Sequence, residues 1–189
     1  EELPVLPFMD DNGNPLTVTI ELPGRNVEAR LWEIRIGRIP LYLLDSDVEV
    51  NSPADRELTS KLYLSDLDSR ISQEIILGIG GVRALRALGY NPDVWHMNEG
   101  HSAFMVLERV RELVAAGNTF ESAAEIVRSA TIFTTHTNVP AGSDEFPIWL
   151  VDKYFYNFWS QLGLTREQFI ELAHHLLPWG ETFSMPILA

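Results

Sequence analysis

The sequence contains no cysteine, so neither disulfide bonds nor thiolate metal sites are available to it. The absence of cysteine also fits the cytoplasmic location that we expect. No apolar run approaches the roughly 18 residues of a membrane-spanning helix, and we expect no membrane contact. With 46% hydrophobic residues over 189 positions, the chain can still bury a sizeable core.

Positive charge is also scarce. Lysine and arginine together number 14, against 27 aspartates and glutamates, and the net charge is −13. Nucleic-acid binding requires clustered Lys and Arg, so we expect no nucleic-acid partner. A neutral ligand such as a sugar is compatible with this charge, whereas a phosphate would need positive charge supplied locally or from elsewhere.

The first 50 residues favour β structure. Asn12-Gly13 is a strong hairpin signal, and it precedes an expected strand at 16–22. Alternating apolar residues predict further strands at 27–36 and 39–44, and the polar stretch 45–57 reads as a loop.

Helical patterns follow from about residue 72. Apolar residues at three- and four-residue spacing form one stripe, which Gly89 and Pro92 end. The stripe consists of Ile75, Ile76, Ile79, Val82, Leu85 and Leu88.

The next segments alternate between strand and helix. Strands are expected at 94–98 and 131–135, with helices at 102–116 and 119–129 between them. This order predicts an α/β fold in which the two strands are parallel. An aromatic-rich helix is expected at about 145–161, and Thr165 with Gln168 forms a capping box for a last helix.

Polar residues follow both strands of the expected parallel sheet. Asn98, Glu99 and His101 come after the first strand, and His136 and Thr137 after the second. Ligands of open α/β sheets bind outside the carboxyl ends of the strands. Either cluster alone is equally compatible with a loop that caps a helix. Two clusters at one edge favour a shared binding crevice.

Other motifs are weaker. The histidines have no spacing that predicts a metal site, and no Gly-x-Ser-x-Gly nucleophile motif occurs. A carboxylate pair for glycoside hydrolysis remains open, but the spacing selects none of the candidates. These are Asp93, Glu99, Asp144 and Glu145. The "GIGG" run at 78–81 is better explained by close helix packing than by phosphate binding, and the aromatic residues at 154–159 are expected mostly in the core.

Two stretches carry a family resemblance. "RISQEIILGIGGVRALRALGYNPDVWHMNEGHSAF" at 70–104 and "FTTHTNVPAGSDEF" at 133–146 resemble the bacterial and archaeal branch of the α-glucan phosphorylases, relatives of glycogen and maltodextrin phosphorylase. The better-known branch carries Asn-Asp-Thr-His-Pro at 98–102 and Asn-His-Thr at 135–137. The match is therefore specific without being identical, and it leaves the role of Glu99 less defined than that of His136.

The resemblance implies an enzyme that degrades α-1,4-glucans with inorganic phosphate and releases glucose 1-phosphate. It implies a GT-B type architecture, in which a cleft separates two Rossmann-like domains and pyridoxal phosphate is held on a lysine of the C-terminal domain. It places His136 near the 6-hydroxyl of the glucosyl unit, with Asn98–His101 lining the same cleft. The expected substrate-binding residues are His136, Asn98, Glu99, His101 and Thr137; no catalytic, cofactor-binding or metal residue is expected in this chain.

The chain is expected to be a fragment of the N-terminal domain, with a β-rich segment at 1–50 and an α/β and helical segment at 58–189. Its two lysines, Lys61 and Lys153, do not match the cofactor lysine. We therefore expect the fragment alone to bind no pyridoxal phosphate and to be inactive. It should also expose apolar surface and be marginally stable or self-associate, and a homo-oligomer is compatible.

Two alternatives remain. One is a glycosyltransferase of the same two-domain architecture, similar to glycogen or starch synthase, that uses a sugar nucleotide. The other is a carbohydrate-binding or regulatory module with no catalytic activity.

Overall fold

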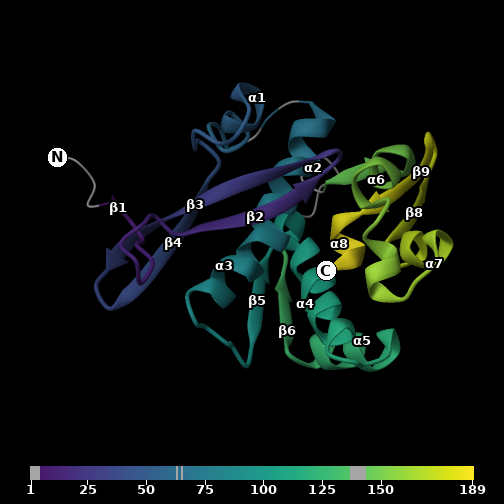
Figure 1. Cartoon of the computed structure of the whole chain (residues 1–189). Helices are drawn as coiled ribbons and strands as arrows, with labels where there is room; N and C mark the ends of the chain where they lie inside the picture. Colours follow the sequence, from purple (N-terminus) through teal and green to yellow (C-terminus); the bar gives the residue numbers. More distant parts are fainter. Residues whose placement is uncertain (1–4, 63, 65, 137–143) are drawn as a thin grey trace.

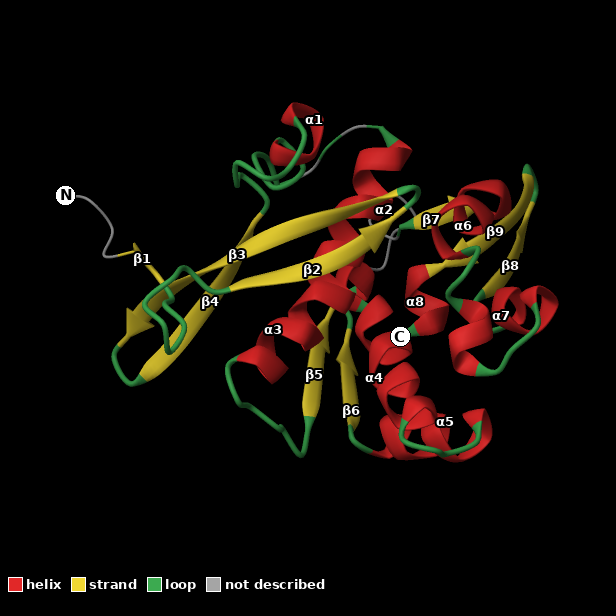
Figure 2. Ribbon diagram, in the orientation of Figure 1, coloured by secondary structure: helices red, strands yellow, loops and turns green. Residues whose placement is uncertain are grey.

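The computed structural model describes residues 5–62, 64, 66–136 and 144–189. Within these residues, an antiparallel ribbon, a two-stranded parallel sheet and a three-stranded antiparallel sheet follow one another along the chain. Helices lie between and around the sheets (Figure 1). The chain is a mixed α/β protein, as Figure 2 shows by secondary structure.

The N-terminal ribbon contains β1 (Val5–Pro7), β2 (Thr17–Leu22), β3 (Arg25–Ile36) and β4 (Ile39–Asp45). The long central strand β3 pairs with the other three, always antiparallel. Alternate apolar residues of β2 and β3 are buried, which is the period-two pattern of a half-buried sheet. The three longer strands confirm the prediction; the short β1 was not predicted.

The next segment contains the short helix α1 (Pro53–Arg56), α2 (Leu67–Ile75), the π-helical turn η1 (Ile76–Gly80) and α3 (Gly81–Ala87). Two predictions are wrong here, because α1 lies in the expected loop and α2 begins before residue 72. Both helices start with side-chain caps: Ser52 accepts from the backbone N–H of Asp55, and Asp66 from that of Ser69. The polar first turn of α2 carries no apolar stripe, so periodicity alone missed it.

Gly78, in the π-helical turn, allows the helices to cross closely. A Cβ atom at this position would lie 2.8 Å from the backbone nitrogen of Met105 and 2.9 Å from the Cβ of Phe104. Real Cβ atoms do not approach so closely, so only glycine fits. The expectation that "GIGG" serves helix packing is confirmed at Gly78.

The parallel sheet consists of β5 (Trp95–Asn98) and β6 (Thr131–Thr134). Their register pairs Trp95 with Thr131 and Asn98 with Thr134, so both strands end at the same level. The connection between them contains the 3-10 turn η2 (Gly100–Ser102), α4 (Phe104–Ala115) and α5 (Phe120–Ser129). The predicted pair of parallel strands is confirmed, with the helices between them close to their expected bounds.

The C-terminal segment forms the three-stranded antiparallel sheet. Its elements are β7 (Glu145–Pro147), α6 (Ile148–Phe155), η4 (Trp159–Leu162), α7 (Arg166–Glu171), β8 (His174–Leu177), β9 (Gly180–Ser184) and α8 (Met185–Leu188). Strand β9 lies between β7 and β8. The capping box of α7 is confirmed, but the single helix expected at 145–161 is wrong. Its first residues pair with β9 instead, and its last turn is a separate 3-10 turn.

The fold-class prediction is therefore confirmed only in its coarser form. A mixed α/β chain with a preceding β-rich segment is correct, but the parallel sheet has two strands within the described residues. The second sheet of the 58–189 segment is antiparallel, which the prediction did not include. None of the helices in the described part of the chain combines the length and apolar character that a membrane span requires.

Aromatic side chains join the C-terminal sheet to the helices of the parallel sheet. The rings of Phe104 in α4 and Phe155 in α6 have centroids 4.8 Å apart, and those of Phe169 and Phe183 are 5.6 Å apart. All four side chains are buried. Of the aromatic residues expected in the core, Phe155 confirms the prediction, whereas Tyr156 is 69% exposed.

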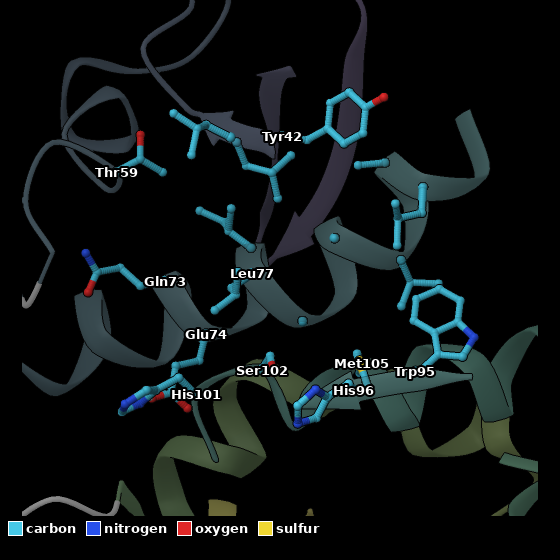
Figure 3. A pocket seen from close by; sticks show the side chains of 18 of the residues that line it. Tyr42, Thr59, Gln73, Glu74, Leu77, Trp95, His96, His101, Ser102 and Met105 are labelled. Atoms are coloured by element: carbon cyan, nitrogen blue, oxygen red, sulfur yellow. The ribbon is translucent and has the colours of Figure 1, made fainter. Parts of the chain in front are cut away.

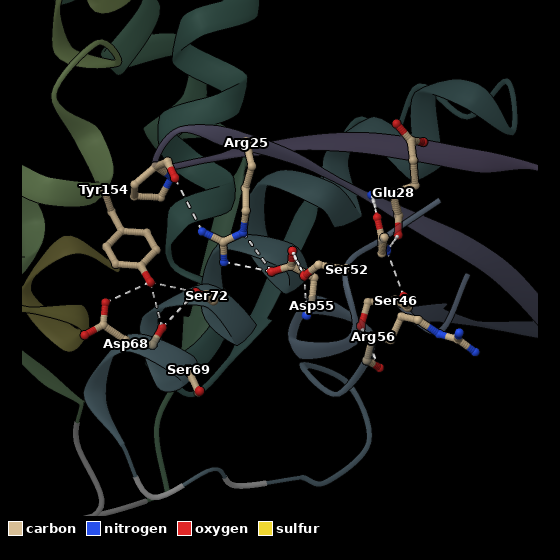
Figure 4. A network of polar contacts seen from close by, with 12 residues as sticks. Arg25, Glu28, Ser46, Ser52, Asp55, Arg56, Asp68, Ser69, Ser72 and Tyr154 are labelled. Atoms are coloured by element: carbon tan, nitrogen blue, oxygen red, sulfur yellow. Dashed lines mark hydrogen bonds and ion pairs between the residues drawn. The ribbon is translucent and has the colours of Figure 1, made fainter. Parts of the chain in front are cut away.

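Polar contacts tie the ribbon and α6 to the N-terminal helices (Figure 4). Arg25 of β3 forms an ion pair of 2.7 Å with Asp55 in α1. The hydroxyl of Tyr154 donates to the backbone oxygen of Asp68, and Ser72 donates to that hydroxyl, both at 3.0 Å. These contacts hold α1 against the ribbon and α2 against α6, and α2 carries residues of the site described next.

Candidate functional site

The carboxyl ends of β5 and β6 bring one set of predicted residues together. His136 Nε2 lies 3.2 Å from Asn98 Oδ1, and the backbone N–H of His136 donates to Glu99 Oε1 at 2.5 Å. Thr135 Oγ1 donates to Glu99 Oε2 at 3.0 Å. We call Asn98, Glu99, Thr135 and His136 the strand-end cluster. His136 is exposed, so its ring is accessible to a ligand at this edge.

Glu99 has an unusual backbone conformation, with φ 64° and ψ 176°. This region is occupied almost only by glycine, because a Cβ atom clashes there with the neighbouring backbone. Its N–H nevertheless continues the parallel ladder by donating to the backbone oxygen of Thr134 at 2.8 Å. The chain therefore turns sharply immediately after β5.

Gly100 fixes the direction of the chain after this turn. A Cβ atom there would lie 3.2 Å from backbone and side-chain atoms of Met185 and from the nitrogen of Pro186, at the start of α8. The C-terminal segment thus packs directly against the loop that follows β5. This close approach directs His101 away from the strand-end cluster and toward α2.

His101 belongs to a second group of side chains, formed with Arg70, Glu74 and Asp144, which we call the buried-glutamate cluster. His101 Nδ1 lies 2.9 Å from Asp144 Oδ2 and 3.0 Å from Arg70 Nη2. Arg70 also donates to both carboxylate oxygens of Asp144, at 3.1 and 2.7 Å. The cluster joins α2, the turn after β5 and the start of β7.

Glu74 lies deepest in this cluster, and its side chain is only 2% exposed. Its nearest cation is Arg70, 3.3 Å away, and neither carboxylate oxygen has a hydrogen bond of ordinary geometry. Burial, together with the neighbouring Asp144, raises the pKa of Glu74 to about 10. Burial alone would also raise the pKa of Asp144, but hydrogen bonds from Arg70, the nearby carboxyl group of Glu74 and the contact with His101 lower it to about 2. At neutral pH, Glu74 is therefore protonated and Asp144 is ionised.

One ligand atom each from Glu74, His101 and Asp144 lie within 4.8 Å of one another, as a metal site would require. The guanidinium of Arg70 already occupies this position, however, and both oxygens of Asp144 accept from it. A divalent cation here would face the positive charge of Arg70 at close range. The geometry therefore supports an ion-pair cluster.

A largely apolar groove of about 720 Å³ opens beside the buried-glutamate cluster (Figure 3). Its walls come from β4, the α2–α3 helix and β5. Figure 3 shows Glu74 and His101 together at one end and Trp95 at the other. His136 is not among the residues that line this groove.

The predicted site residues thus divide into two groups. Asn98, Glu99 and His136 are in contact, as the shared-edge argument required, and His101 follows the same strand end. The side chain of His101 lies in the buried-glutamate cluster and lines the apolar groove. His136 does not line that groove. Thr137 lies outside the described residues.

Arg70 and Glu74 were missed as site residues. A signal for them was present, because Glu74 stands at an inward-facing position between Ile71 and Ile75, three and one residues away. A carboxyl group inside an apolar stripe requires a partner, and Arg70 precedes it by the four residues of one helical turn. Asp144 appeared among the sequence candidates only as one of several carboxylates.

The histidines of the C-terminal sheet have structural contacts. His175 Nδ1 in β8 lies 2.9 Å from Glu145 Oε1 in β7, and Thr182 in β9 donates to Glu145 Oε2 at 2.6 Å. These side chains link the three strands of that sheet. His96, in β5, lies 2.8 Å from the hydroxyl of Thr134 in β6 and links the parallel pair in the same way.

Lys153 does not suit a site for covalently bound pyridoxal phosphate. Lys153 is 46% exposed and forms an ion pair with Asp68, whose hydrogen bond raises the pKa of Lys153. A raised pKa disfavours the neutral amine that a Schiff base requires. Lys61 is exposed at the groove. Lys153 is therefore disfavoured as the attachment point for this cofactor.

Comparison with known proteins identifies the family to which this chain is related. Over all 189 residues the chain is 45% identical to a maltodextrin phosphorylase from Thermococcus litoralis. The chain is homologous to a segment of the maltodextrin and glycogen phosphorylases. A glycogen phosphorylase from Mycobacterium tuberculosis is 49% identical over 159 residues, which is 80% of this chain. One from Aquifex aeolicus is 32% identical over the whole chain.

The matched segment is a small part of these phosphorylases. The chain spans 22%, 18% and 27% of the three relatives, or about a fifth of their length. No family model matches the chain. Relationship to the phosphorylases is thus established for this segment.

Proposed function

We propose that this chain is part of a larger α-1,4-glucan phosphorylase, which cleaves glycogen, starch or maltodextrin with inorganic phosphate and releases glucose 1-phosphate. The observation that carries this proposal is the 45% identity to a maltodextrin phosphorylase along the entire chain. The strand-end cluster adds physical support, because it lies where ligands bind in α/β sheets.

In this proposal the chain supplies contacts to the sugar. His136 exchanges a hydrogen bond with the 6-hydroxyl of the glucosyl unit. Because Asn98 Oδ1 accepts from His136 Nε2, the Nδ1 atom is left to accept a hydrogen bond from a sugar hydroxyl. An imidazole at an exposed strand end can exchange hydrogen bonds with a neutral ligand, and a net charge of −13 is compatible with such a ligand.

The phosphate and the cofactor belong, in this proposal, to other parts of the protein. The Rossmann-like, GT-B type architecture would be completed by strands and a second domain outside this chain. Pyridoxal phosphate, which supplies proton transfer through its phosphate group when bound, would be attached there, since neither Lys61 nor Lys153 matches the cofactor lysine that the family resemblance implies. The cytoplasmic location and the homo-oligomer stay predictions.

Exposed apolar side chains fit a segment that is covered in a larger protein. Ile36 and Ile39 of the ribbon are 62% and 60% exposed, and Leu77 at the groove is 50% exposed. Apolar clusters of this kind usually mark an interface. The isolated chain should therefore self-associate or be marginally stable, and it should be inactive.

The test is phosphate-dependent release of glucose 1-phosphate from maltodextrin by the complete protein that contains this chain. Release that requires phosphate and pyridoxal phosphate supports the proposal. Transfer of glucose only from a sugar nucleotide would instead identify a synthase-like enzyme. Glucan binding without either reaction would identify a non-catalytic carbohydrate-binding module.

A further inference from the structure

Glu99 has a positive backbone φ angle although it is not a glycine. Elsewhere in the described residues, every positive φ belongs to a glycine. Examples are Gly13, Gly24 and Gly37, with φ values of 79°, 72° and 62°. At Glu99 the chain accepts a strained conformation that glycine would adopt freely. The side chain must therefore do something that glycine cannot do.

The contacts of the carboxylate identify this task. Both oxygens of Glu99 accept hydrogen bonds from the chain leaving β6, one from the backbone N–H of His136 and one from the hydroxyl of Thr135. The strained turn directs the carboxylate sideways, across the ends of the two strands. An extended or helical backbone at Glu99 would direct it elsewhere.

His136 is consequently held at two points by consecutive residues of the neighbouring strand. Glu99 fixes its backbone at 2.5 Å, and Asn98 lies 3.2 Å from its ring nitrogen Nε2. Backbone and ring are thus fixed independently, which sets the direction of the remaining nitrogen, Nδ1. Small errors in the position of a contacting group weaken its contribution strongly.

We propose that Glu99 is a positioning residue that fixes His136, and that it does not bind the glucan itself. The strained backbone is the means by which its carboxylate reaches the N–H of His136. This inference rests on the proposed function for its kinetic consequences, while its structural part stands on the contacts alone.

The structural part is tested by hydrogen–deuterium exchange at the His136 amide in the complete protein. In Glu99→Gly the amide loses its charged acceptor, and we expect exchange to accelerate by at least about tenfold. Glu99→Gln keeps an oxygen that accepts from the same N–H, so its exchange should lie between those of the wild type and Glu99→Gly. Wild-type exchange in Glu99→Gly would overturn the proposal.

Thermal stability separates positioning from simple support of the fold. Glu99→Gly removes two hydrogen bonds but also relieves the strain, so its Tm should not fall. The matched control is Glu125→Gly, at an exposed position inside α5, where glycine costs helix stability and Tm should fall. A larger Tm loss for Glu99→Gly than for Glu125→Gly would show that Glu99 mainly supports the fold.

A double-mutant cycle with His136→Ala tests whether Glu99 acts through the histidine. Glu99→Gly alone should lower kcat/KM for maltodextrin between about tenfold and a hundredfold. In the His136→Ala background it should cause no further loss, because no ring remains to be positioned. Losses that multiply would show that Glu99 contacts the glucan directly and would overturn the proposal. If the complete protein lacks phosphorolysis, the exchange result still decides the structural part, and only the proposed function fails.

Discussion

The strand-end cluster and the buried-glutamate cluster lie close along the chain but have opposite physical character. The first is mostly exposed, combines an amide, an imidazole, a hydroxyl and a carboxylate, and includes a strained backbone. The second is largely buried and combines an arginine, an ionised aspartate and a protonated glutamate. Asn98 and His101 are only three residues apart, and the turn at Glu99 and Gly100 separates them.

This difference indicates different tasks. Exposed polar groups with fixed directions are suited to a ligand, whereas a buried charge cluster holds elements together. Arg70 connects α2 to the start of β7 through Asp144, across 74 residues of sequence. This difference supports the proposal that His136 contacts the sugar and indicates that Arg70 holds the elements together.

The largest expected effect is at Arg70. Arg70→Met would leave the ionised Asp144 without its guanidinium partner, and removing one partner of a buried ion pair costs about 3–5 kcal/mol. Urea unfolding of the complete protein measures this loss. The matched control is Arg56→Met, whose pair with Asp47 is exposed and should contribute less than about 1 kcal/mol. Equal losses for the two variants would remove the distinction between the clusters.

The next effect is at His136 and concerns activity. Losing one partner of a hydrogen bond in a desolvated cleft costs about 1–3 kcal/mol. His136→Ala should therefore lower kcat/KM for glucan by about one to two decades, with little change in Tm because the side chain is exposed. A lower Tm with unchanged turnover per folded molecule would make His136 a structural residue.

The last effect is a pH dependence at Glu74, which is the smallest of the three when it is expressed per pH unit. Because its pKa is raised to about 10, the stability that Glu74 contributes is complete below its ordinary value of 4.5 and declines as pH rises toward 10. Glu74→Gln remains neutral, so its stability relative to the wild type should increase with pH in this window. The slope should be at most about 1.4 kcal/mol per pH unit, measured by urea unfolding at pH 5, 7 and 9.

Glu108→Gln is the control for this pH dependence. Burial would raise the pKa of Glu108, but hydrogen bonds from Arg111 and Arg83 lower it. Glu108 is therefore ionised from pH 5 to 9, and its variant should differ from the wild type by a constant amount. A constant difference for Glu74→Gln as well would mean that Glu74 is ionised in the folded protein and paired with Arg70.

Local patterns predicted most of the elements. The apolar alternation of β2 and β3, the glycine that ends α4 and the cap at Thr119 are all encoded within a few neighbouring residues. The antiparallel sheet of the C-terminal segment was missed because Glu145–Pro147 is short and leads into an aromatic helix. Its strand character arises from pairing with β9, far along the chain.

The site was predictable to a similar degree. Placing Asn98, Glu99 and His136 together required only the carboxyl ends of two parallel strands. The separate environment of His101 was not predictable, because it depends on the positive φ of Glu99 and on the contact of Gly100 with Met185. These are tertiary effects without a local signature.

The central claim, that His136 contacts the 6-hydroxyl of the glucosyl unit, is tested most directly with a glucan that lacks this hydroxyl at the cleaved unit. The complete protein and its His136→Ala variant are compared by kcat/KM on the normal and the deoxy substrate. The account predicts that the deoxy substrate is poor for the wild type and no worse for the variant, because both changes remove the same contact. Independent losses that multiply would contradict it.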